Sequence, residues 1–358
     1  MEQNKGLKTL LTIGALVLFA LFLFWADNYL DDYKIRILNM SAIFVILGLS
    51  LNLINGFTGL FSLGHAGFMS VGAYTVALLT MSPEVKEMNF YMYEIWEPLL
   101  HIHLPLLPSL IAAGIVAAFI AFLIGLPVLR LRGDYLAIAT LGFAEIIRVI
   151  FTNTHSLTNG ALGLKGIPQT TNLWWNWGIA IIVIFILKNI INSSYGRAFM
   201  AIRDDEIAAE AMGISLFKHK LLSFMIGAFF AGVGGALYGI IISTIDPLAF
   251  RFTLTYQVLM IVVIGGMGSL TGSVIAGVLV TVMLELLRAV EQPMNFFFIQ
   301  IPGIPGMRMV IFSLILLFVI LYYRQGIMGT KEFNWDWVIK KLGLDKNGKG
   351  LNKNAAAK

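Results

Sequence analysis

The sequence predicts an all-α polytopic integral membrane protein, with about ten transmembrane helices, some of them broken by glycine, and with both termini cytoplasmic. Two observations predict this class. Hydrophobic residues make up 58% of the 358 residues and charged residues only 13%, so long runs carry no ionic group, unlike in a soluble globule of this size. These runs are also close to about 20 residues long, the length that a helix needs to cross the hydrocarbon core of a bilayer.

The apolar runs give the positions of the predicted helices. They cover about residues 8–26, 35–54, 60–81, 104–129, 133–152, 174–191, 220–243, 254–266, 271–290 and 308–323. The eighth run is short for a span. The first run has no small-residue cleavage site before Asp27, so we expect a retained span and not a cleaved signal peptide.

Basic residues predict the orientation. If Lys5 and Lys8 are cytoplasmic, the excess of Lys and Arg falls into loops on that same side, as the positive-inside rule expects. These loops hold Arg130, Arg132, Lys188, Arg197, Arg203, Lys218, Lys220, Arg324 and Lys331. The excess of basic residues that gives the net charge of +5 therefore lies mainly on one side of the membrane, and we expect no nucleic-acid partner.

The residue inventory excludes several kinds of site. The sequence contains no cysteine and no HExxH pair among its five histidines, so a disulfide framework is excluded and no metal site is expected. An intramembrane enzyme is disfavoured, because no acidic dyad, Ser and His pair or metal cluster lies at a shared predicted depth.

A charged island at residues 195–220 separates two apolar runs and is the most informative segment. Asp204, Asp205 and Glu206 open an alanine-rich stretch, which suits the positive end of a helix dipole, and Gly213 supplies a stop. The helix between them, at about 1.5 Å per residue, is roughly 15 Å long, too short and too charged to span a bilayer. We therefore predict a docking helix at the membrane face, within a loop at residues 192–219.

Glycine, and not charge, interrupts two other apolar stretches, at residues 51–74 and 262–277. Broken membrane helices occur where a protein lines a cavity, so these stretches are predicted to line a translocation path. The candidate path residues are Gly59, Ser62, Gly64, His65, Gly67, Gly265, Gly266, Gly268 and Ser269. For a lone histidine such as His65, the alternative is a hydrogen-bonded group in helix packing.

Two acid–base pairs lie within or beside predicted spans. Glu145 with Arg148 and Glu285 with Arg288 are three residues apart, so each pair shares a helix face and can neutralise itself. Ionisable groups in spans are functional candidates, and the alternative is a structural ion pair at the interface. The recurrence of Glu and Arg at this spacing suggests one register for an internal repeat, and the two glycine-broken stretches suggest another. The two registers imply different offsets and cannot both hold, and neither is established.

Residues 326–358 differ in character from the rest, being rich in Lys, Asn and Gly. They predict a basic cytoplasmic tail that is disordered at its end and contacts anionic lipid headgroups. Residues 1–325 then form the transmembrane domain. The sequence leaves the role of the outer loop at residues 82–103 open.

Several motifs occur in a fixed order. They are LGLSLNLINGFTGLFSLGHAGFMSVGAY, RLRGDYLAIATLGFAEIIRVIFTNT, NGALGLKGIP, YGRAFMAIRDDEIAAEAMGI, IGGMGSLTGSVIAG and RQGIMG. Together they cover residues 43–329 and resemble the branched-chain amino acid ABC transporter permease family, specifically the SLGHAGF-type subunit of the high-affinity leucine, isoleucine and valine importer.

The resemblance implies partners and a coupling loop. The partners are a sister permease, two cytoplasmic ATPase subunits and an external or periplasmic solute-binding protein, in the cell inner membrane. The residues that match the family's ATPase-coupling loop, with Asp204 beside them, are Gly196, Arg197, Ala198, Arg203, Glu206, Ala208, Ala209, Glu210, Ala211, Gly213 and Ile214. The chain has no GxxxxGK[ST] loop, so we expect no bound cofactor here and ATP use by the partners. As a mechanism, residues 203–213 would move as a rigid lever.

One segment departs from the sequence pattern of the family. Residues 157–163 read LTNGALG, where relatives commonly have a Thr-Gly-Gly-x-Asn-Gly run, and this segment faces the outer side in the predicted topology. Urea or short-chain amides are therefore an alternative to branched-chain amino acids. A different class, an ion-coupled secondary transporter, would need ionisable groups near mid-membrane, whereas Glu145, Arg148, Glu285 and Arg288 lie toward the outer ends.

Overall fold

The computed structural model describes residues 3–291, 294–296, 299–301, 304, 306–322 and 325–333. It contains two compact units, Met1–Asp31 with Lys331–Lys358, and Asp32–Thr330. In the first unit, α1 (Gln3–Tyr29) is long and apolar enough to cross a membrane. Most of the predicted disordered tail, from residue 334 onward, lies outside the described residues.

The second unit is helical, with only four very short strands among its described residues. Its long helices are α2 (Asp32–Asn52), α3 (His65–Thr80), α6 (Leu106–Val128), α7 (Asp134–Asn153), α9 (Leu173–Asn192), α12 (Leu216–Ile242), α13 (Phe252–Gly265), α14 (Leu270–Leu286) and α15 (Met307–Tyr322). Shorter helices are α4 (Pro83–Asn89), α5 (Glu97–Leu100), α8 (His155–Thr158), α10 (Ser194–Asp204) and α11 (Glu206–Ala211). The strands form two antiparallel pairs, β1 (Leu164–Lys165) with β2 (Thr244–Ile245), and β3 (Met294–Phe296) with β4 (Ile299–Ile301).

The all-α membrane class is confirmed, because each predicted apolar run contains a helix, although residues 60–64 of the third run are not helical. Among the described residues, six helices are long and apolar enough to cross a membrane: α1, α2 with its extension to Phe57, α6, α7, α9 and α12. The helices α13 and α14 are shorter apolar helices; the short eighth run predicts this for α13, whereas the ninth run predicts a helix of full span length. The last turn of α2 is a π-helix, Leu53–Phe57, which carries the chain into the first glycine-broken stretch.

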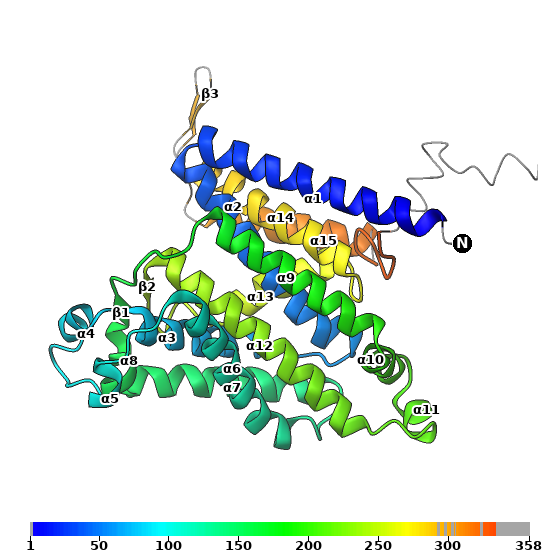
Figure 1. The fold of residues 1–358 in the computed structure, drawn as a ribbon, viewed down its shortest axis with the longest axis horizontal. Coiled ribbons are helices and arrows are strands. Elements are labelled where there is room, and N and C mark those ends of the chain that lie inside the picture. The colour runs from blue at the N-terminus through cyan, green and yellow to red at the C-terminus, as the bar shows by residue number, and fades with distance from the viewer. Residues whose placement is uncertain are drawn as a thin grey trace, which may run out of the picture. The chain divides into compact units, whose positions relative to one another are not determined.

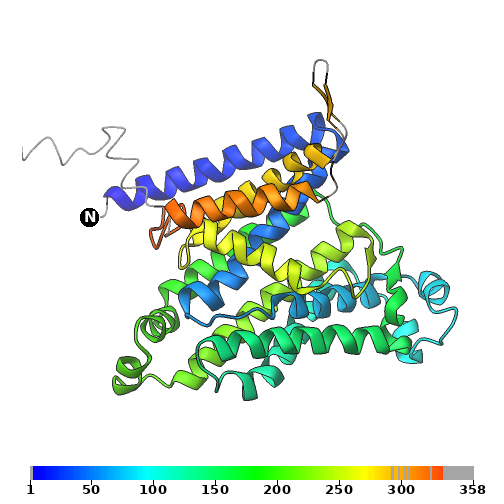
Figure 2. The same ribbon diagram turned by 180° about the vertical axis from the view of Figure 1, so that it is seen from behind.

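The core of the second unit lies around α12, which packs on α2, α3 and α6 (Figure 1). Small residues make this packing close: α12 carries five glycines, and Ala228, Ala231 and Ala236 are fully buried. On the other side of α2, α14 packs along it and α13 packs on α14, as the view from behind shows (Figure 2). Small residues at helix crossings are the usual way for helices to associate in a membrane, because they let backbones approach.

The connections of the second unit gather at two opposite ends of the helices. The short helices α4, α5 and α8 lie at one end, and α10 and α11 lie at the other, in both views (Figures 1 and 2). The β1–β2 pair joins the connection before α9 to the connection after α12, at the α4–α5 end. We refer below to the α4–α5 end and the α10–α11 end.

A buried lysine holds the long connection at the α4–α5 end. Lys86 on α4 is 0% exposed, and its Nζ donates to the carbonyl oxygens of Leu99 at 2.7 Å and Ile102 at 2.6 Å. Burial disfavours the ammonium form and lowers the pKa of Lys86. The two carbonyls tie α4 to α5 and fix the path of the predicted outer loop.

Replacing Lys86 with glutamine is expected to change how stability depends on pH. Because the folded-state pKa of Lys86 lies below its unfolded value of 10.5, the unfolded chain binds more protons between these two values. Stability contributed by this group therefore rises as pH rises through that window. Thermal unfolding of detergent-solubilised protein, from neutral pH to about pH 10.5, should show this rise in the wild type and a smaller one in Lys86→Gln. Equal slopes in the two proteins would contradict the prediction.

Candidate functional site

The predicted docking helix is two helices in the structure. Residues 203 and 204 end α10, and the separate helix α11 spans only Glu206–Ala211. The break is at Asp205, whose Oδ1 accepts from the backbone N–H groups of Ile207 at 2.8 Å and Ala208 at 3.1 Å. Asp205 is therefore the N-cap of α11, and the predicted single lever at residues 203–213 is divided at this residue.

The short helix α11 has a fixed side and an open side. Ala209 is 3% exposed, and Glu206 forms an ion pair with the buried Lys220 of α12 at 2.5 Å. On the open side, Ile207 is 77% exposed and Met212, just after the helix, is 83% exposed. Exposed apolar residues on a helix that is tethered on its other side suit a protein contact.

The predicted coupling residues on and near α10 also fall into a buried group and an exposed group. Gly196 is buried and so close to the preceding helix that a Cβ atom on it would lie 2.1 Å from the Ile191 carbonyl oxygen. Arg197 is exposed and donates to the Asn192 carbonyl oxygen at 3.3 Å. The exposed members of the predicted set also include Asp204, Glu210 and Gly213. We use the name coupling segment for residues 192–219.

Arg203 connects the coupling segment to both glycine-broken stretches. Its Nη1 donates to the Gly56 carbonyl oxygen at 3.3 Å. A Cβ atom on Gly59 would lie 3.0 Å from Arg203 Cγ, and one on Gly268 would lie 2.9 Å from Arg203 Nη1. The two stretches are about 210 residues apart in sequence, and the Arg203 side chain lies against both.

Asn52 joins the same two stretches from within the core. Its Oδ1 accepts from the Gly268 N–H at 2.9 Å, and its Nδ2 donates to the Ser269 carbonyl oxygen at 2.9 Å and to Ser273 Oγ at 2.7 Å. Asn52 is fully buried, so these bonds satisfy its amide where no water is at hand. We did not predict Asn52 as a site residue, although a polar side chain inside an apolar run is a signal for a buried network.

The turn between α13 and α14 depends on glycine. Gly266 and Gly268 have φ angles of +112° and +90°, which L side chains rarely adopt. Ser269 then caps α14 by accepting from the Gly272 N–H at 3.0 Å. The RQGIMG segment covers this turn, because the N–H groups of Ile327 and Met328 donate to the carbonyl oxygens of Ile264 and Gly265.

The other predicted path residues lie in close helix packing. A Cβ atom on Gly64 would lie 2.8 Å from the Thr140 carbonyl oxygen, and one on Gly67 would lie 3.0 Å from Ala144 Cα, both on α7. His65 is 1% exposed, and its Nε2 is 2.9 Å from Ser50 Oγ. Ser62 is also buried, with its backbone N–H donating to the Asn55 side chain. A role for these residues in a path stays a prediction.

Two threonines satisfy the backbone where the chain enters α3. The Leu63 N–H donates to Thr140 Oγ1 at 3.0 Å, and the Ala66 N–H donates to Thr255 Oγ1 at 2.8 Å. Non-helical backbone is tolerated at membrane depth only when protein groups or water satisfy it. Thr140 and Thr255 therefore allow the break between α2 and α3, and our sequence reasoning did not identify either of them.

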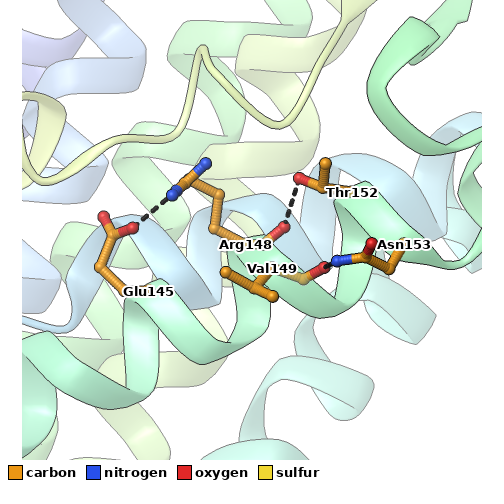
Figure 3. Close-up of polar contacts among 5 residues, drawn as sticks. All are labelled: Glu145, Arg148, Val149, Thr152 and Asn153. Carbon is orange, nitrogen blue, oxygen red and sulfur yellow. Dashed lines mark hydrogen bonds and ion pairs between the residues drawn. The ribbon is translucent and has the colours of Figure 1, made fainter.

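The two predicted ion pairs form. Arg148 Nε lies 2.6 Å from Glu145 Oε2 on α7, next to ordinary i to i−4 bonds from Thr152 and Asn153 (Figure 3). Arg288 Nη1 lies 3.0 Å from Glu285 Oε1 at the end of α14, and Tyr33 also donates to this carboxylate at 2.6 Å. Each pair neutralises itself on its own helix face, which is the arrangement of a structural ion pair.

Comparison with known proteins identifies the family. A model of the family described as branched-chain amino acid transport system, permease component, matches residues 33–321. Over 289 residues the chain is 36% identical to the high-affinity branched-chain amino acid transport system permease protein LivM of Salmonella typhimurium, covering 71% of this chain and 64% of that protein. It is 35% identical to the LivM protein of Escherichia coli, covering 71% of this chain and 63% of that protein. The chain thus spans less than two thirds of the length of these two relatives.

A third relative matches a shorter region. The permease protein LivH of Salmonella typhimurium is 32% identical over 107 residues, which cover 30% of this chain and 34% of that protein. No solved structure matches the chain. The family model covers most of the chain, and several helices are long and apolar enough to cross a membrane. The chain is therefore a multi-pass protein of the inner membrane and belongs to the family of branched-chain amino acid transport permeases.

Proposed function

We propose that this chain is one permease subunit of an ATP-binding cassette importer. With a sister permease it forms the path for branched-chain amino acids that an external binding protein delivers. Two ATPase subunits dock on the coupling segment and hydrolyse ATP, so this chain carries out no catalysis itself. The solute class is supported by the names of the LivM relatives, and the sister permease by the additional similarity to LivH.

The contact of Arg203 with both glycine-broken stretches is the observation that carries this proposal. A force applied to the exposed side of α11 and α10 reaches Gly56, Gly59 and Gly268 through one side chain. Energetic coupling between distant sites needs such a connected set of packed groups. The α10–α11 end is cytoplasmic in this proposal, because Arg130, Arg132 and most of the loop Lys and Arg residues belong to that side.

Copurification of the tagged chain from native membranes tests the assembly. Recovery of two ATPases and a second permease, with ATP-driven leucine uptake by the reconstituted complex, is the expected result. A chain that is recovered alone and transports solute in proteoliposomes without ATP would instead be a secondary transporter. An assembled complex that takes up urea or a short-chain amide, and not leucine, would retain the importer and correct its solute.

Reversing the charge of Glu210 is expected to uncouple transport from ATP. Glu210 is exposed on α11, and no described residue forms an ion pair with it, so Glu210→Lys changes the docking face and not the core. Loss of a desolvated carboxylate at this interface should weaken the binding of the ATPase subunits by about 2–3 kcal/mol, which is roughly a hundredfold in affinity. ATP-driven uptake and solute-stimulated ATP hydrolysis measure the effect.

Two controls make the Glu210 result interpretable. Glu84→Lys makes the same charge change on an exposed residue of α4, at the opposite end of the helices, and should leave binding of the ATPase subunits unchanged. Thermal unfolding of Glu210→Lys should match that of the wild type. Coupled uptake that survives Glu210→Lys undiminished would count against docking through α11.

A further inference from the structure

A cleft of about 870 Å³ opens at the α4–α5 end of the second unit, away from the coupling segment. Its walls come from the start of α2, the ends of α12 and α14, the middle of α13 and the start of α15. Pockets for small molecules in proteins commonly measure about 300–1,000 Å³, so the volume suits a small solute. None of the path residues that the sequence predicts lines this cleft.

The lining of the cleft carries more positive than negative charge. Arg36, Arg288 and Arg308 line it together with a single carboxylate, that of Glu285. Arg288 and Glu285 already form an ion pair with each other at 3.0 Å. In the part of the chain that the structure describes, Arg36 has no ion-pair partner. The lining therefore has one guanidinium group without an ion-pair partner among the described residues, that of Arg36, and a second, that of Arg308, whose ion pair with Glu291 is long at 3.9 Å.

Arg308 has a hydrogen-bond donor without an acceptor. Its Nε is buried and has no hydrogen-bond partner among the described residues. The carboxylate of Glu291 is 3.9 Å away, which is beyond hydrogen-bond distance. A buried guanidinium donor without an acceptor is costly, and an arriving carboxylate is the acceptor that matches a guanidinium best.

The apolar part of the lining suits the rest of an aliphatic amino acid. Ile37, Met40 and Phe44 of α2 face the same cleft as Leu284 of α14. An alkyl side chain that leaves water for such a wall gains stability in proportion to the area buried. Thr281 lines the cleft as well, and its hydroxyl donates to the Gly277 carbonyl oxygen at 2.7 Å, which leaves the oxygen free to accept from an ammonium group.

We propose that this cleft is the entry site of the permease for a zwitterionic aliphatic amino acid. The guanidinium groups of Arg36 and Arg308 receive the α-carboxylate, and the α2 wall receives the side chain. The inference rests on the proposed function for the choice of solute. It assigns solute recognition to the permease itself, at the ends of α2 and α15, before the solute reaches the glycine-broken stretches.

Cysteine labelling tests the site without using transport as its readout. The chain contains no cysteine, so Met40→Cys places a single thiol in the lining of the cleft. In the assembled complex, L-leucine at about four times its Kd should slow maleimide labelling of this thiol about fivefold. Leucinamide, which keeps the ammonium and the side chain but has no carboxylate, should not slow it. Glu84→Cys, on exposed α4 outside the cleft, should label at the same rate with and without leucine.

The arginines are tested in the same background. Adding Arg308→Gln or Arg36→Gln to Met40→Cys should remove protection by leucine, while thermal unfolding shows whether each protein is folded. Equal protection by leucinamide, protection that survives both substitutions, or no protection by leucine at all would overturn the proposal. ATP-driven leucine uptake, measured on the same preparation, separates the two ideas. Uptake without protection refutes the entry site alone, and protection without ATP-driven uptake refutes the importer alone.

Discussion

Replacing Gly72 with alanine is expected to destabilise the protein severely. A Cβ atom at this position of α3 would lie 2.0 Å from the carbonyl oxygen of Gly232 on α12. The atom it meets belongs to the backbone, which cannot rotate away as a side chain can. Overpacking of a core typically costs about 1–3 kcal/mol and occasionally more, and we expect at least the upper figure here. The measurement is thermal unfolding of the detergent-solubilised protein, together with its yield from membranes.

Gly142 provides the matched control for this substitution. It lies within α7, and a Cβ atom there would meet nothing within 4 Å. Because alanine favours a helix over glycine by about 1 kcal/mol, Gly142→Ala should unfold at the same temperature as the wild type or above it. If Gly72→Ala unfolds like Gly142→Ala, the backbones of α3 and α12 do not approach as closely as described.

Replacing Asn52 with leucine is expected to have the second largest effect. The change removes the acceptor of the Gly268 N–H and one donor each to the Ser269 carbonyl oxygen and to Ser273 Oγ, while the N–H and hydroxyl of Ser273 still donate to the Ser269 carbonyl oxygen. A buried polar group left without a partner costs about 1–3 kcal/mol, so a loss of about 2 kcal/mol is expected. We also expect the turn between α13 and α14 to lose its position against α2, and ATP-driven uptake to fall with it.

The control for Asn52 is an asparagine with only a local bond. Asn192 is exposed, and its Nδ2 donates to the Lys188 carbonyl oxygen four residues earlier. Exposed positions of this kind usually change stability by less than about 0.5 kcal/mol, so Asn192→Leu should unfold like the wild type. Thermal unfolding of the two variants side by side gives the comparison. Near-equal unfolding temperatures would mean that the Asn52 network contributes little.

The helices could be predicted from the sequence because their cause is local. A run of about 20 apolar residues can satisfy its own backbone in lipid only as a helix, and each predicted run contains one. The break at Asp205 could not be placed in the same way. Asp204, Asp205 and Glu206 are adjacent acids that all suit a helix start, and only the hydrogen bonds of Asp205 to Ile207 and Ala208 select the cap.

The connections between distant segments could not be predicted, because their cause is not local. Asn52 and Gly268 are 216 residues apart, and no period or spacing in one sequence relates them. The same holds for Arg203, whose charge predicted an exposed contact but whose side chain lies against Gly56 and Gly59. The cleft lined by Arg36 and Arg308 arises from five helices, none of which forms a motif by itself.

The glycine contacts of α12 also limit which parts of this permease can move. Gly232 packs closely against two helices. A Cβ atom on it would lie 2.8 Å from the Ala113 carbonyl oxygen of α6, and its own carbonyl oxygen leaves no room for a Cβ atom at Gly72 of α3. Helices in such backbone contact cannot slide past each other without first separating. We expect α3, α6 and α12 to travel as one rigid body in any transport cycle. The hinges must then lie outside this body, in the π-turn at Leu53–Phe57 and in the glycine turn after α13.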